Sequence, residues 1–449
     1  MGRSSVSSSI RSRVGRLAPF RAVAELRHEF PRVVLVLAAG DLVASFGFSL
    51  FFPFLTIYLV QVLGATAAQA GLVIAAYSLC SIVSGIVGGW LADRIGRRPV
   101  LIGSISCTTL LVISMAFAVE AWQVGLVMLL LGCIDPAFLP AARAAVADAV
   151  QEDRRPRAFA LLAVANAVGW IAGPVIGAGL STLGYPLLFA VSGLLIGVYV
   201  VIGLRWLPET RPSGTHVGTP PIADLPAGVG VVGVPMEIPA TFRDGSPGTG
   251  GTVDGPRLRI FAAFLPLLAV IQAVTFLWVT TLPIYAAGPL RLATPMWGLL
   301  FGLNGLLIVL FQMRVSKAGE KRSKPCLIAV SLGLYMAGLA IVAPLSSAIA
   351  APGLAVTITL VTFGEMLLMP IVPAFVSDLA PANRRGAFQG VALAAGGLGS
   401  GLGPPIAGFV LDAGQGAILW LGCAAVLGVV VLALLGLARQ ADRLAPVGG

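Results

Sequence analysis

Three carboxylic acids stand inside long apolar stretches of the chain. Asp41 lies in LAAGDLVAS, Asp135 in GCIDPAF and Glu365 in FGEMLLMP. An ionised carboxylate in the core of a bilayer costs at least about 2.5–3.5 kcal/mol, so such a group usually faces a polar interior and serves a function. Removal from water favours the protonated carboxyl group, which could then load and release a proton near neutral pH. The chemistry that these residues suggest is proton transfer or the binding of a cation.

Each of these acids also has a structural interpretation, in which it is neutral and hydrogen-bonded. Pro136 follows Asp135, so that carboxyl group could instead cap a broken turn. Asp41 has no acidic counterpart in the seventh apolar stretch, which makes it the most distinctive of the three. For Glu365 both interpretations stay open. The two histidines, His28 and His216, fall outside the apolar stretches and cannot form a relay within them.

A substrate-binding interior would need further polar and aromatic groups. Asparagine is costly in lipid, so the two asparagines among the candidates should face inward. Aromatic side chains are weaker candidates, because most of those in membrane proteins are simply packed or face lipid. The predicted cavity wall comprises Asn166, Trp170, Gln272, Trp278, Tyr285 and Asn304.

The composition decides which elements carry these residues. Of 449 residues, 57% are hydrophobic and 11% are charged, and the mean hydropathy is +0.96, which excludes a soluble globular protein. An apolar helix of about twenty residues crosses the ~30 Å bilayer core, where backbone groups must be bonded within the helix. The sequence therefore predicts an all-α membrane protein with twelve transmembrane helices. The predicted spans are 34–59, 67–91, 99–119, 122–147, 158–181, 186–207, 259–286, 295–315, 325–345, 350–377, 386–411 and 416–438.

Basic residues gather on one side of these spans. The net charge is +10, and 28 of the 29 Lys and Arg residues fall in the termini or in alternate gaps, which leaves only Arg291 on the other side. The positive-inside rule then predicts that both termini are cytoplasmic. The chain has 26 Arg and 3 Lys, which suggests a GC-rich bacterium and hence a bacterial inner membrane. A nucleic-acid partner is not expected, because the sequence has no basic folded domain with interleaved aromatic residues.

Nothing in the sequence predicts enzyme chemistry or a cofactor. It contains no P-loop, no nucleophile–base pair and no metal-ligand spacing. The cysteines are odd in number and scattered in or beside apolar spans, which favours packing over disulfides or zinc. They are Cys80, Cys107, Cys133, Cys326 and Cys423.

The chain divides into two related halves. A segment rich in proline and glycine interrupts the apolar pattern and predicts a flexible linker. The predicted segments are a tail at 1–32, a six-helix half at 33–207, the linker at 208–257, a second six-helix half at 258–438 and a tail at 439–449. A shift of 230 residues pairs Asp135 with Glu365, Pro140 with Pro370, Asp148 with Asp378, and Gly173-Pro174 with Gly403-Pro404. Parallel repeats place the substrate site at their interface near the bilayer midplane.

The gap between the second and third spans concentrates charge in GGWLADRIGRRPVL, residues 88–101. This stretch resembles the signature loop of the major facilitator superfamily. The twelve spans and the central linker agree, so the resemblance covers nearly the whole chain and implies a transporter that works by alternating access as a monomer. The residues that carry the resemblance are Gly89, Leu91, Ala92, Asp93, Arg94, Gly96, Arg97 and Arg98.

The resemblance implies a latch that closes the cytoplasmic side in the outward-open state. Asp93 would face the N-terminus of the eleventh helix, where a carboxylate is favoured by the helix dipole, and Arg97 would pair with Asp93 and Asp148. The alternative is that these arginines only fix the topology. We favour that interpretation for Arg94 and Arg98, and the latch for Asp93 and Arg97. The second half has Lys317 where Asp93 would fall, which predicts a degenerate second latch.

The fifth span resembles the glycine–proline motif of drug/proton antiporters in this superfamily. The matching residues are Gly169, Gly173, Pro174, Gly177 and Gly179. Small residues four apart permit close helix contact, which we expect with the eighth span, although ordinary membrane helix packing uses the same pattern. Many such antiporters also carry an arginine in the fourth span, four residues before a glycine, where this chain has Met128.

The sequence thus predicts proton-coupled export of small amphipathic or cationic compounds. Proton-coupled uptake of a nutrient or metabolite is the first alternative. A membrane enzyme or non-transporting sensor on the same scaffold is the second, although neither a catalytic cluster nor a folded soluble domain supports it. A channel is disfavoured, because a latched two-half repeat suits alternating access.

The latch can be tested by the substitution Asp93→Asn, which removes the charge and keeps the size. We expect altered transport and a changed ratio of inward- to outward-facing molecules, because the cytoplasmic closure loses a helix-capping carboxylate. Transport assays and accessibility labelling on each side measure the two effects. A variant that matches the unsubstituted protein in both would rule out a latch at Asp93.

Overall fold

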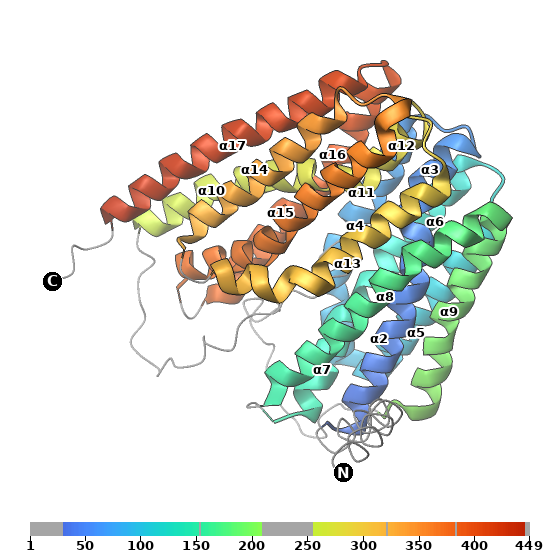
Figure 1. The fold of residues 1–449 in the computed structure, drawn as a ribbon. Helices are drawn as coiled ribbons and strands as arrows, with labels where there is room; N and C mark the ends of the chain where they lie inside the picture. The colour runs from blue at the N-terminus through green and yellow to red at the C-terminus, as the bar shows by residue number, and fades with distance from the viewer. Residues whose placement is uncertain (1–29, 152–153, 209–254, 320–321, 382–383, 445–449) are drawn as a thin grey trace, which may run out of the picture.

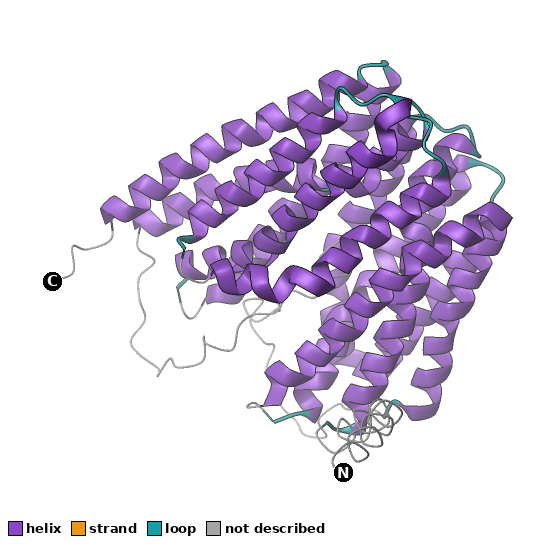
Figure 2. Cartoon of the chain, in the orientation of Figure 1, coloured by secondary structure: helices purple, strands orange, loops and turns teal. Residues whose placement is uncertain are grey.

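The computed structural model describes residues 30–151, 154–208, 255–319, 322–381 and 384–444, and every regular element in these ranges is helical (Figure 2). The predicted N-terminal tail and the linker at 208–257 fall mainly on residues 1–29 and 209–254, outside the described residues. Of the predicted C-terminal tail at 439–449, residues 439–444 instead continue α17, and residues 445–449 lie outside the described residues. The described residues contain twelve helical runs long and apolar enough to span a membrane. This confirms the predicted all-α fold, and the ends agree with the predicted spans to within four residues.

The first half contains six spans, two of which are interrupted by short 3₁₀ turns. Its elements are α2 (Arg32–Phe51), η1 (Phe52–Phe54), α3 (Leu55–Gln61), α4 (Ala67–Ile95), α5 (Arg97–Ser114), η2 (Met115–Phe117), α6 (Ala121–Ile134), η3 (Asp135–Ala137), α7 (Phe138–Ala149), α8 (Arg155–Leu183) and α9 (Tyr185–Trp206). The interruptions in the first and fourth spans contain Pro53 and Pro136. Proline has no N–H group to continue a helical hydrogen-bond ladder.

The second half repeats this order. Its elements are α10 (Gly255–Thr275), α11 (Leu277–Thr280), α12 (Leu282–Ala287), α13 (Thr294–Gly319), α14 (Lys324–Val342), η7 (Ser347–Ile349), α15 (Ala350–Leu379), α16 (Arg385–Asp412) and α17 (Gly416–Leu444). The 230-residue register holds in three dimensions, since α7 ends at Ala149 and α15 ends at Leu379. The interrupting prolines Pro53 and Pro283 obey the same register.

The two halves converge at one end of the molecule and point apart at the other (Figure 1). The convergent end contains the connections at 62–66, 288–293 and 413–415, and we call it the far end. The divergent end contains Asp93, Arg97, Lys324 and the start of α2, and we call it the basic end. Across the halves, α4 packs on α16, α8 on α13, and α3 on α12.

The α8–α13 contact corrects one sequence expectation. The two helices meet as expected, but the glycines that bring them together lie on α13. A Cβ atom at Gly298 would lie 2.6 Å from the Pro174 carbonyl oxygen, and one at Gly305 would lie 2.9 Å from the Ile171 side chain.

The glycines of the α8 motif face α2 instead. Cβ atoms at Gly169, Gly173 and Gly177 would clash with α2, whereas one at Gly179 would meet open space. Pro174 is on the other face of α8, against α13. A regular glycine spacing predicts that one face of a helix lacks side chains, but it does not predict which helix packs against that face.

The glycine seam on α13 yields a test. Gly298→Leu places a side chain where the backbone of α8 lies, and overpacking of this kind costs about 1–3 kcal/mol. We expect the closed far end to lose roughly tenfold to a hundredfold in population relative to an open one. Spin labels at the exposed Leu183 and Ile349, in a background without native cysteines, report the distance between the halves at this end.

Gly333→Leu is the matched control, because a Cβ atom at Gly333 meets no heavy atom within 4 Å. The control should leave the label distances unchanged. Equal distance distributions in both variants would show that the α8–α13 seam does not hold the far end closed.

Candidate functional site

The first acidic cluster joins α2 to α8. Asn166 Nδ2 donates to Ser45 Oγ at 2.6 Å. Asn166 Nδ2 and Ser45 Oγ each also donate to Asp41 Oδ1 at 3.4 Å. Periodicity explains the grouping, because Asp41 and Ser45 are four residues apart and share one face of α2. The hydroxyl group of the buried Tyr199, on α9, lies close enough to interact with the Asp41 charge. Asp41 thus has neutral hydrogen-bond donors as its partners.

The second cluster surrounds Asp135 at the break in the fourth span. Thr108 Oγ1, on α5, donates to Asp135 Oδ1 at 3.2 Å. Ser104 Oγ donates to the Ile134 carbonyl oxygen at 2.9 Å, so a side chain from α5 satisfies the backbone beside the break. Tyr77 and Asp41 lie near enough to Asp135 to interact electrostatically with its carboxylate. The carboxyl group therefore bonds to a neighbouring helix and faces the same interior as Asp41.

The third cluster lies in the second half. Asn304 Nδ2, on α13, donates to Glu365 Oε2 at 3.1 Å and to Thr362 Oγ1 at 2.9 Å. Glu365 is only 7% exposed and Asn304 only 6%. Tyr335, on α14, is buried near the same carboxyl group. This cluster repeats the pattern of the first, because an asparagine again donates to an acid on a neighbouring helix.

The two asparagines belong to the helices that meet across the halves. Asn166 is on α8 and Asn304 is on α13, beside Gly305, which contacts Ile171 of α8. The structure therefore places a carboxylate–amide cluster on each side of the α8–α13 seam. A movement at this seam displaces the two clusters relative to each other.

The three aromatic residues of the predicted cavity wall pack against different partners. Trp170 lies among Phe48 and Phe52 of the first half. Trp278, 3% exposed, stacks on Phe301 within the second half. Tyr285, 7% exposed, packs edge-on against Trp420 near the far end.

Gln272 lies near the middle of the seventh span. Thr275 Oγ1 donates to Gln272 Oε1 at 3.4 Å, and a Cβ atom at Gly396 of α16 would lie 3.2 Å from the Gln272 side chain. Gln272 thus packs against the same helix that crosses to α4 in the first half.

Both ion pairs expected of Arg97 are present at the basic end. Arg97 Nη1 lies 2.8 Å from Asp93 Oδ1, and Arg97 Nε lies 3.2 Å from Asp148 Oδ2. Its guanidinium also donates to the Ala92 carbonyl oxygen at 2.9 Å. Gly96 has φ +107°, a conformation that disfavours side chains, and this lets α4 turn directly into α5. All of these contacts lie within the first half, and the Asp93 side chain remains 51% exposed.

The neighbouring residues of the signature loop have other contacts. Arg94 lies over the Trp90 ring, 5.1 Å from its centroid. Arg98 Nη2 donates to the Leu204 carbonyl oxygen at 2.9 Å, which ties α5 to α9. Gly89 lies in α4, but the close approach occurs at Gly88, where a Cβ atom would lie 2.4 Å from Ala137.

The second half retains part of the latch geometry that its sequence does not show. Lys324 at the start of α14 pairs with Asp378 on α15, as Arg97 pairs with Asp148. The sequence identified Asp378 as the repeat partner of Asp148 but missed Lys324, because the offset there is not 230 residues. Lys317 replaces the counterpart of Asp93, so only one of the two ion pairs is repeated.

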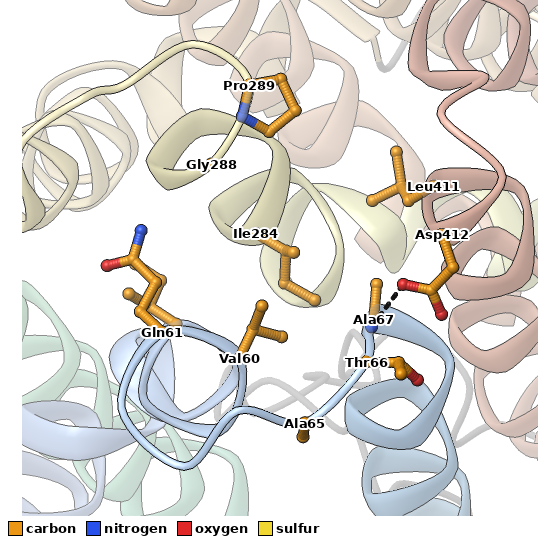
Figure 3. A pocket seen from close by; sticks show the side chains of 11 residues that line it. Val60, Gln61, Ala65, Thr66, Ala67, Ile284, Gly288, Pro289, Leu411 and Asp412 are labelled. Carbon is orange, nitrogen blue, oxygen red and sulfur yellow. Dashed lines mark hydrogen bonds between the residues drawn. The ribbon is translucent and has the colours of Figure 1, made fainter.

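A pocket of about 170 Å³ lies between the halves at the far end (Figure 3). It is lined by Ile57, Val60, Gln61, Ala65, Thr66, Ala67, Ile284, Gly288, Pro289, Leu411 and Asp412. None of the six predicted cavity residues lines it. Sequence reasoning also missed Asp412, whose carboxylate accepts hydrogen bonds from Ala67 and Ala68 across the two halves. Its one sequence signal was its position, because acids are scarce in the far-end connections.

Relatives share this architecture over most of the chain. An uncharacterized MFS-type transporter YqjV of Bacillus subtilis (strain 168) is 27% identical over 379 residues, which cover 83% of this chain and 85% of the relative. The class G tetracycline resistance protein of Vibrio anguillarum is 26% identical over 399 residues, covering 86% and 92%. The multidrug resistance protein MdtG of Enterobacter lignolyticus is 30% identical, but over 39% of this chain and 44% of its own.

Solved structures agree on the fold. A POT family transporter crystallised with a thioalcohol-conjugated peptide superposes with a TM-score of 0.73 at 15% identity, covering 91% of this chain and 96% of the other. The nucleoside transporter NupG superposes with a TM-score of 0.69 at 13% identity, covering 91% and 99%. The Major Facilitator Superfamily profile matches residues 37–404. The chain with paired halves, a charged α4–α5 turn and buried carboxyl clusters is therefore a multi-pass membrane transporter of the major facilitator superfamily.

Proposed function

We propose that this transporter exports small amphipathic or cationic compounds in exchange for protons. The observation that carries the proposal is the set of partners of the membrane acids. Asp41, Asp135 and Glu365 accept hydrogen bonds from Ser, Thr and Asn side chains, and none of the three forms an ion pair within the described part of the chain. A carboxyl group with neutral donors is free to bind either a proton or a cationic substrate.

The position of the acids supports exchange rather than simple binding. Asp41 and Asp135 are close enough to repel each other when both are ionised, so a proton or a cationic substrate at one of them relieves that repulsion. The clusters at Asn166 and Asn304 flank the seam between α8 and α13, so rocking of the halves would alter their surroundings. Occupancy of the acids and the direction of opening would in this way be linked.

The similarity to a tetracycline resistance protein and to multidrug resistance proteins supports export as the direction. Under this proposal the basic end faces the cytoplasm of a bacterial cell, because basic residues favour that side of a membrane. The far end, where the halves converge (Figure 1), would then face outward, and the conformation would be that of an inward-facing transporter. One chain would suffice, with small-molecule substrate, protons and the lipid bilayer as its only partners.

Transport into proteoliposomes tests both the coupling and the direction. With an acidic lumen, an antiporter accumulates a permanently charged lipophilic cation such as tetraphenylphosphonium, which protonation cannot trap. We expect accumulation to cease when nigericin collapses the pH gradient. Asp41→Asn and Asp135→Asn should each abolish gradient-driven accumulation, because an amide cannot exchange a proton.

Glu120→Gln is the control, because Glu120 is a far-end carboxylate whose partner Trp122 lies in its own half. It should transport as the unsubstituted protein does. Accumulation only with an alkaline lumen would instead indicate uptake by symport, and full activity in both aspartate variants would remove these carboxyl groups from the coupling.

A further inference from the structure

The N-terminus of α4 is completed by a residue from the other half of the molecule. A helix begins with four N–H groups that have no partner within it. In α4 a capping box satisfies two of them, since Thr66 Oγ1 accepts from Gln69 N and Gln69 Oε1 accepts from Thr66 N. The N–H groups of Ala67 and Ala68 remain, and the local sequence offers them no acceptor.

Asp412, the last residue of α16, satisfies both of the remaining groups. Its Oδ1 atom accepts from Ala67 N at 2.8 Å and its Oδ2 atom from Ala68 N at 2.9 Å (Figure 3). Each carboxylate oxygen takes one N–H group, and the negative charge lies at the positive end of the α4 dipole. Charge-assisted bonds in this position are among the stronger ones that a protein surface offers.

Close backbone packing brings Asp412 into reach. A Cβ atom at Gly408 would lie 2.4 Å from the Ala67 carbonyl oxygen, and one at Gly71 would lie 2.5 Å from the Pro404 carbonyl oxygen. Asp412 follows Gly408 by four residues and therefore shares its face of α16. The glycine contact thus fixes the helix pair so that the carboxylate meets the first turn of α4.

The repeat does not impose an acid at this position. The 230-residue register pairs Asp412 with Thr182, at the end of α8, which donates to the carbonyl oxygen of Gly179 in its own helix. Near that second crossing, Trp297 Nε1 of α13 donates to the carbonyl oxygen of Pro53, in η1, at 3.1 Å. The cap at Asp412 is therefore a property of the α4–α16 crossing alone.

A pocket lies beside Asp412, so the hydrogen bonds of Asp412 contribute a larger part of the contact between the halves at this end. Thr66, Ala67, Leu411 and Asp412 form one wall of the pocket, and Ile57 and Ile284 belong to the wall of α3 and α12. The halves meet around a void here, so apolar packing is incomplete next to the cap. The two hydrogen bonds of Asp412 join the halves beside this void.

We propose that Asp412 is a gating residue that holds the far end closed, by capping α4 only while the transporter faces the basic end. This inference rests on the alternating access of the proposed function. It mirrors the latch expected of Asp93, which would cap α16 at the opposite end of the same helix pair in the other state. In each state one helix of the pair caps the other, so closing one end releases the carboxylate of the other.

Label distances at the far end test the inference without substrate or a pH gradient. In nanodiscs, with spin labels at Leu183 and Ile349, Asp412→Ala should raise the ratio of open to closed far ends by roughly tenfold, because two charge-assisted bonds are lost from the closed state only. Asp412→Asn keeps one acceptor oxygen and loses the charge, so it should fall between. Asp412 is exposed, so these variants remove no core packing.

Glu120→Ala is the matched control, because the Glu120 carboxylate lies at the N-terminus of α6 at the same end and accepts from Trp122 Nε1, within its own half. It should leave the label distances unchanged. No shift in Asp412→Ala, or an equal shift in Glu120→Ala, would overturn the assignment. A failure of proton-coupled export in vesicles would leave this measurement unaffected, so failure of the gating inference and failure of the proposed function can be told apart.

Discussion

A polar group inside a bilayer has no water to bond, so it must find its partner within the protein. The three membrane acids obey this constraint by taking neutral donors from adjacent helices: Asn166 and Ser45 for Asp41, Thr108 for Asp135, and Asn304 for Glu365. An arginine or lysine partner would fix each acid in its ionised form. Neutral donors satisfy the geometry without fixing the charge, and this is the condition for exchanging a proton with a cation.

The same constraint explains which contacts join the two halves. Helices in lipid associate through close packing and polar contacts rather than through burial from water. Glycines such as Gly298 and Gly408 provide the close packing between the halves. A helix-end contact, that of Asp412, provides a polar contact between them. Smooth glycine surfaces permit sliding, whereas caps at helix ends are either formed or broken. The arrangement suits a molecule with two stable states.

The sequence predicted what depends on local pattern. Hydropathy located the twelve spans, the register of Pro140 with Pro370 located the repeat, and the α4–α5 motif predicted both partners of Arg97. The sequence did not predict that Gly173 faces α2 while Pro174 faces α13, because a face of small residues does not specify which helix packs against it. Asp412 was missed because its two acceptor bonds span 345 and 344 residues, and only the folded chain brings those groups together.

The central claim is that buried carboxyl groups exchange protons for a cationic substrate, and proton release measures this most directly. Purified protein in a weakly buffered detergent solution is mixed with a panel of lipophilic cations while a pH indicator records the response. The account predicts release on addition of a substrate cation and its loss in Asp41→Asn or Asp135→Asn. Absence of release with every cation, or equal release in the unsubstituted protein and both variants, would contradict it.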